Sequence, residues 1–138
     1  MKLQLVMNTD MRLLVYTAFI CVVMWVPYIV VAIRAFGLKR MAGAYPTPAY
    51  TSLPQWAQRL HRAHMNLVEN IGPFAALVIV AQMTGAANEM TALGARLFFW
   101  ARLVQIAGHT AGIPWSRTGA FAVGWIGNIV ILVQILSR

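Results

Sequence analysis

Apolar residues run in long unbroken stretches along this chain, instead of alternating with polar residues at the spacing of a half-buried strand. Four stretches stand out, at residues 13–33, 67–83, 93–113 and 118–136. The first and the last contain no charged residue, the second contains only Glu69, and the third contains Arg96 and Arg102. A membrane-spanning helix needs roughly 20 consecutive apolar residues. The pattern therefore predicts an all-α fold, a bundle of four transmembrane helices.

The polar connections between these stretches set the expected boundaries. They place the spans at approximately residues 11–35, 57–84, 90–112 and 116–137, within a single domain covering residues 1–138. Asn88 or Thr91 suits the cap of the third helix, and Gly112 suits its end. Residues 37–56 form the longest connection, and their three prolines predict an irregular segment near the lipid head groups.

Composition agrees with a membrane protein. Hydrophobic residues make up 60% of the chain and charged residues 10%, whereas soluble domains carry about 25% charged residues. The net charge of +8 does not indicate a nucleic-acid-binding protein, because the positive residues are scattered and no nucleic-acid-binding motif accompanies them.

The positive residues are better explained by membrane topology. Most of them lie in the connection between the first and second stretches: Arg34, Lys39, Arg40, Arg59 and Arg62. Arg117 lies on the same side, in the turn before the fourth stretch. The opposite side holds Lys2, Arg12, Arg96 and Arg138, against Asp10 and Glu89. Because cytoplasmic loops carry an excess of lysine and arginine, both termini are expected to face away from the cytoplasm. The compact chain and short loops suggest a multi-pass protein of a bacterial inner membrane.

Polar side chains form a stripe at the start of the second span. At about 100° per residue, Arg62, Asn66 and Glu69 fall within roughly 60° of one another around the helix axis. Facing lipid, such charges would cost on the order of 3 kcal/mol each on insertion scales. The stripe must therefore face another helix or a water-filled crevice.

The third span carries a matching stripe, formed by Arg102, Gln105 and His109. The two stripes are expected to meet, with Glu69 near Arg102 or Arg62. One interpretation is an ion pair that only fixes the register of the helices. The other is an anion-binding crevice, which explains the excess of arginine and the additional polar residues.

A metal site is not predicted. His61 and His64 lie three residues apart, but no third ligand shares their face of the helix. They are expected to be interfacial side chains.

The segment RLHRAHMNLVENIGPF resembles the R-A-x-x-N-x-x-E pattern on the second helix of the MAPEG family, the membrane-associated proteins of eicosanoid and glutathione metabolism. The segment ARLVQIAGHTAGIPWSRT at the third helix and the following turn is similar to that family as well. The resemblance implies a homotrimer of four-helix subunits that bind glutathione at the subunit interfaces. It also implies conjugation of glutathione to a lipophilic electrophile, or reduction of a lipid hydroperoxide.

The resemblance also implies roles for individual residues. Arg62, Asn66 and Glu69 would contact glutathione, and Arg102 would complete the cage. Arg117 would lie beside the thiol and favour the thiolate, which is the nucleophile. Gln105 and His109 complete the set of binding residues expected from the second stripe. His109 occupies a position where family enzymes usually have a tyrosine, and an imidazole can still donate a hydrogen bond there.

Two other functions fit the same pattern. One is a non-catalytic membrane protein of this fold that binds a lipid or a thiol. The other is a small four-helix exporter of cationic drugs, which the arginines argue against because they would repel such a substrate.

Overall fold

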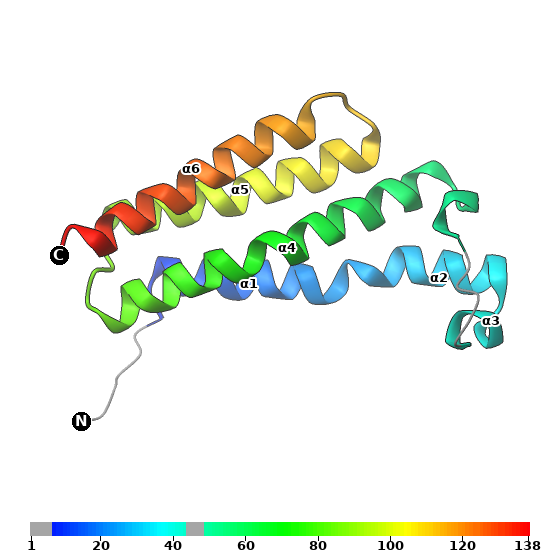
Figure 1. The fold of residues 1–138 in the computed structure, drawn as a ribbon, viewed down its shortest axis with the longest axis horizontal. Coiled ribbons are helices and arrows are strands. Elements are labelled where there is room, and N and C mark those ends of the chain that lie inside the picture. The colour runs from blue at the N-terminus through cyan, green and yellow to red at the C-terminus, as the bar shows by residue number, and fades with distance from the viewer. Residues whose placement is uncertain (1–6, 44–48) are drawn as a thin grey trace.

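The computed structural model describes residues 7–43 and 49–138, and in these two parts all regular secondary structure is helical (Figure 1). The elements are α1 (Thr9–Val23), α2 (Trp25–Phe36), α3 (Leu38–Ala42), the 3₁₀ turn η1 (Tyr50–Ser52), α4 (Gln55–Met83), α5 (Glu89–Ala111) and α6 (Ser116–Leu136). The expected all-helical fold is confirmed.

The long helices lie side by side in an elongated bundle. In Figure 1, α1 and α2 follow one another along α4, and α5 and α6 form a second pair; α5 packs against both α4 and α1. The start of α1 and the end of α6 lie at the same end of the bundle. The turn between α5 and α6 lies toward the opposite end, where α2 meets α3.

Three of the described helical segments are long and apolar enough to cross a membrane. They are Thr9–Phe36, Gln55–Met83 and Ser116–Leu136. Helix α5 is 23 residues long but is not one of them, and it contains Glu89, Arg96 and Arg102. The protein is an integral membrane protein.

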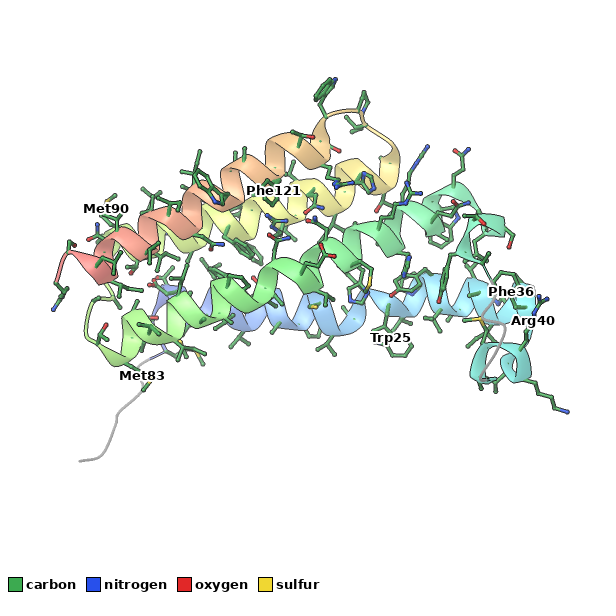
Figure 2. The ribbon with its side chains drawn as sticks, in the orientation of Figure 1. Trp25, Phe36, Arg40, Met83, Met90 and Phe121 are labelled. Atoms are coloured by element: carbon green, nitrogen blue, oxygen red, sulfur yellow. The ribbon has the colours of Figure 1, made fainter. Side chains whose placement is uncertain are left out.

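The first expected span is not one continuous helix, because α1 ends at Val23 and α2 begins at Trp25. Pro27 explains this break: it lacks an N–H, and its ring collides with the carbonyl group four residues earlier in a continuous helix. Proline is tolerated in the first turn of a new helix, which is where Pro27 lies in α2. Figure 2 shows Trp25 pointing away from the bundle at this break.

A buried histidine connects the break to α4. His64 is only 7% exposed, so its predicted position as an interfacial side chain is wrong. Its Nε2 lies 2.9 Å from the carbonyl oxygen of Cys21, and its Nδ1 lies 2.7 Å from the hydroxyl of Tyr28. Because a carbonyl group only accepts, Nε2 carries the proton and the Tyr28 hydroxyl donates to Nδ1. His64 thus holds the end of α1 and the start of α2 against α4. His61, one turn earlier, is half-buried and stacks on Tyr50.

We expect Tyr28→Phe to destabilise the protein by about 1–2 kcal/mol, because the variant leaves the buried Nδ1 of His64 without its donor. Tyr16→Phe is the matched control, since Tyr16 is 49% exposed on α1. Thermal unfolding in detergent measures both variants. Equal stability of the two would show that the hydrogen bond between Tyr28 and His64 contributes nothing.

The expectation of an irregular segment at residues 37–56 is wrong in part. A short helix, α3, and the 3₁₀ turn η1 lie within it. Residues 44–48 fall outside the described part of the chain, as does Lys2, which entered the charge argument.

Helices α5 and α6 are held together at a glycine contact. A Cβ atom on Gly94 would lie 2.6 Å from the carbonyl oxygen of Gly127, closer than real Cβ contacts. The ends of α5 agree with the sequence: Asn88 and Thr91 form a capping box, and Gly112 ends the helix with φ of 81°. These contacts fix the position of α5, and with it the position of the second polar stripe.

Candidate functional site

The polar stripe of α4 faces the start of α6 across two adjoining cavities. Asn66, Glu69 and Arg117 line both of them. The larger cavity, of about 470 Å³, is completed by Asn70, Thr118 and Phe121. The smaller, of about 200 Å³, is completed by His61, Arg62 and Met65. We call the two together the Glu69 crevice; Figure 2 labels Phe121 on α6.

Glu69 lies at the midpoint of α4, since 69 − 55 and 83 − 69 are both 14 residues. Its side chain is exposed on the isolated subunit, as are those of Arg62 and Arg117. A carboxylate at this depth of an apolar helix is costly unless a partner covers it. The crevice is therefore a surface that requires a ligand, a neighbouring subunit or both.

The two polar stripes meet, and Arg102 makes the contact. Its Nη1 atom donates to Asn66 Oδ1 at 2.8 Å and to Gln105 Oε1 at 2.9 Å. The guanidinium also lies 5.0 Å from the centre of the Phe98 ring, within the range of a cation–π interaction. Arg102 is therefore hydrogen-bonded to Asn66, whereas the sequence had suggested Glu69 as a possible partner. Glu69 instead shares its cavity with Arg62, the other partner considered.

Arg102 and Gln105 lie behind the crevice. Arg102 is 2% exposed and Gln105 is fully buried, and neither lines either of its two cavities. In the subunit Arg102 reaches the crevice through Asn66, and its direct contact with a ligand stays a prediction. Arg102 holds the amide of Asn66 in one orientation.

The second stripe also retains unused hydrogen-bonding capacity. Arg102 Nε, Gln105 Nε2 and His109 Nε2 are buried and have no partner within the part of the chain that the structure describes. Arginine and the glutamine amide are donors, and arginine is always charged. The interior behind the crevice therefore favours negative charge.

Gly124 of α6 makes room for Arg102. A Cβ atom on Gly124 would lie 2.7 Å from Arg102 Nη2. A side chain there would push the guanidinium away from Asn66 and Gln105, so Gly124 is a positioning residue for the polar network.

We expect Gly124→Ala to destabilise the protein by about 1–3 kcal/mol, because displacing Arg102 leaves buried polar groups unpaired. Gly119→Ala is the matched control on the same helix, since a Cβ on Gly119 has nothing within 4 Å. The control should be neutral or slightly stabilising, as alanine favours helix over glycine. Chemical denaturation of both variants tests this, and similar losses in the two would refute the role assigned to Gly124.

His109 lies in a third cavity, next to the crevice. This cavity, of about 300 Å³, is lined by Arg59, His109 and Arg117, with residues of the α5–α6 turn. The guanidinium of Arg59 rests on Gly112, where a Cβ atom would collide with it. Arg59 was not predicted as a site residue. The spacing of Arg59 could have identified it as a site residue, because it lies three residues before Arg62 and so on a neighbouring face of α4.

The charges around these cavities do not balance. Arg59, Arg62 and Arg117 line them, while Glu69 is their one carboxylate. The whole sequence contains only three acidic residues, and the other two are Asp10 at the start of α1 and Glu89 at the start of α5. The site is therefore suited to an anionic ligand that also carries a positive group for Glu69.

Comparisons with known proteins identify the family of this chain. The sequence profile of the MAPEG family matches residues 13–137. The chain is also similar to microsomal glutathione S-transferase 1 of Sus scrofa, with 27% identity over 89 residues, which are 64% of this chain and 57% of that protein. The match thus spans little more than half the length of that relative. No solved structure was found to match the chain. Because the family profile extends over nearly the whole sequence, the chain belongs to the MAPEG family.

Proposed function

We propose that the protein is a membrane-embedded, glutathione-dependent transferase or peroxidase that acts on lipophilic electrophiles. The observation that carries the proposal is the Glu69 crevice, where a single carboxylate lies among arginines on the surface of an apolar bundle. Glutathione has two carboxylates and one ammonium group, which is the charge pattern that this crevice complements. The name of the pig relative supports glutathione as the ligand.

Each residue of the crevice has a proposed role. Arg62 pairs with a carboxylate of glutathione, and Asn66, fixed by Arg102, donates its amide to the peptide. Glu69 receives the ammonium group. Arg117 borders all three cavities and lies at the start of α6, where it stabilises the negative charge of the thiolate.

Glutathione supplies the sulfur nucleophile. In a conjugation, the thiol proton passes to solvent, a carbon–sulfur bond forms, and the leaving group departs with its electron pair. In a peroxidase reaction, two glutathione molecules reduce one hydroperoxide to an alcohol and water and become a disulfide. In both cases this chain binds the peptide and stabilises negative charge on the sulfur through Arg117, without forming a covalent bond itself.

Oligomerisation follows from the exposure of the crevice. We propose a homotrimer of four-span subunits, in which a neighbouring copy covers Glu69 and Arg62. In each subunit, α5 spans the membrane in addition to the three segments named above. The burial of Arg102 against α4 and α6 supports such a span, because it shields the charge from lipid. The positive residues at the α2–α4 end support termini that face away from the cytoplasm.

Turnover tests this function. Protein purified in detergent and incubated with glutathione and 1-chloro-2,4-dinitrobenzene, or with cumene hydroperoxide, should consume glutathione faster than protein-free micelles. Absence of both activities in protein that binds glutathione would contradict the enzymatic proposal.

A second candidate is a protein of this family that binds a thiol without turnover. The position of His109 favours it, because this residue lies beside Arg59 in the third cavity and not in the Glu69 crevice. Glutathione binding with no consumption of either electrophile would support this candidate.

A further inference from the structure

A separate apolar groove runs along the outer side of α5 and α6. It has a volume of about 470 Å³, within the roughly 300–1,000 Å³ typical of ligand pockets. Its walls are apolar except for Arg96 at one end and Ser116 beside Trp115; the apolar lining includes Trp100 and Val104 from α5, Trp115 from the turn and Val123 from α6. From Arg96 to Val104 the groove follows α5 for about 12 Å at 1.5 Å per residue.

The groove is open to the surroundings of the bundle. Trp100 is 61% exposed, Val104 is 59% exposed and Trp115 is 82% exposed. Gly119 contributes no side chain, and a Cβ on it would meet nothing within 4 Å. Such a long apolar hollow, beside α6, which is long and apolar enough to cross a membrane, is a surface for a hydrocarbon chain.

Arg96 is the one charged residue that lines the groove. It lies seven residues into α5, roughly 10 Å from the helix start, and is exposed. A guanidinium cannot lose its charge, so beside hydrocarbon it must find an anion or extend to the head-group layer. A lipid phosphate meets both needs.

We propose that this groove holds one acyl chain of an anionic phospholipid whose phosphate pairs with Arg96. The head group lies in the leaflet next to the turn between α4 and α5, and the chain runs toward Trp115. The site is distinct from the Glu69 crevice, whose α6 residues are Arg117, Thr118 and Phe121.

Other occupants fit less well. A second copy of the chain would need a carboxylate opposite Arg96; Asp10 is buried and Glu69 lies in the crevice, which leaves only the exposed Glu89. Glu89 is exposed and lies two turns from Arg96 on the same face of α5. It is therefore the carboxylate on that helix that competes with a lipid phosphate for Arg96.

The test is thermal unfolding of delipidated protein in detergent, with phosphatidylglycerol or phosphatidylcholine added to the micelles. We expect phosphatidylglycerol to raise the melting temperature by several degrees more than phosphatidylcholine does. Arg96→Gln should remove this difference, and Arg96→Lys should retain part of it. Gly119→Leu, which fills the groove, should reduce the response to both lipids.

Two matched variants serve as controls. Gly72→Leu places the same side chain on α4, at a glycine whose Cβ would also meet nothing within 4 Å, and should leave both lipid responses unchanged. Glu89→Gln should preserve the preference for phosphatidylglycerol. An equal response to the two lipids, a preference that survives Arg96→Gln, or a response unchanged by Gly119→Leu would overturn the proposal. Stabilisation by oleate alone, or loss of the preference in Glu89→Gln, would also overturn it.

Discussion

Replacing Arg117 with leucine should lower the rate of glutathione conjugation by about 100-fold or more, while glutathione still binds. Removing one group that stabilises developing negative charge in an active site typically costs 10²–10³-fold in kcat. Arg117 borders both cavities of the Glu69 crevice, and it is exposed, so its loss leaves no buried group unpaired. Steady-state kinetics with 1-chloro-2,4-dinitrobenzene, together with glutathione titrations, separates the effect on kcat from the effect on binding.

Arg34→Leu is the control for this experiment, because it removes another exposed arginine, from the end of α2. Its kinetics should equal those of the wild type. Arg117→Lys should recover part of the lost rate, since an ammonium group also stabilises a thiolate. Wild-type kcat in Arg117→Leu would exclude this residue from the chemistry.

Glu69→Gln should weaken glutathione binding by about 30-fold or more, since losing one member of a desolvated charge pair costs about 2 kcal/mol or more. The substitution keeps the shape of the side chain and removes only its charge, so packing around α4 is preserved. Binding is measured by calorimetry on the purified protein. The expected loss is specific to ligands with an ammonium group, and N-acetylated glutathione should bind the variant and the wild type alike.

Glu89→Gln provides the comparison for Glu69, because it neutralises an exposed carboxylate at the far end of α5. Glutathione should bind this variant as it binds the wild type. If Glu69→Gln binds glutathione with wild-type affinity, the ammonium group is held elsewhere and the proposed orientation of the peptide is wrong.

Local sequence signals predicted much of the fold. The capping box of Asn88 and Thr91 and the left-handed Gly112 depend on a few neighbouring residues, which the sequence displays directly. The spacing of Arg62, Asn66 and Glu69 likewise fixes their common face of α4, whatever the neighbouring helices do.

Features that depend on contacts between helices were predicted less well. The break in the first span was not predicted: a proline such as Pro27 can signal one, but its location at Met24 and its support by His64 depend on how α4 packs against α1 and α2. From the sequence, Arg102 and Arg62 were both possible partners of Glu69. In the structure, Arg102 donates a hydrogen bond to Asn66 and not to Glu69. That choice depends on the depth at which α5 lies against α4, and on the space left by Gly124.

Glutathione-dependent stabilisation is the most direct test of the central claim that the Glu69 crevice binds glutathione. A ligand that binds only the folded protein raises its stability with ligand concentration, by about 2.7 kcal/mol at 100 times the Kd. The melting temperature of purified protein should therefore rise steadily across a millimolar glutathione series, and Arg62→Ala should abolish the rise. Arg12→Ala, an exposed arginine on α1, should leave it intact. A melting temperature that stays constant up to several millimolar glutathione, or a rise that persists in Arg62→Ala, would contradict the account.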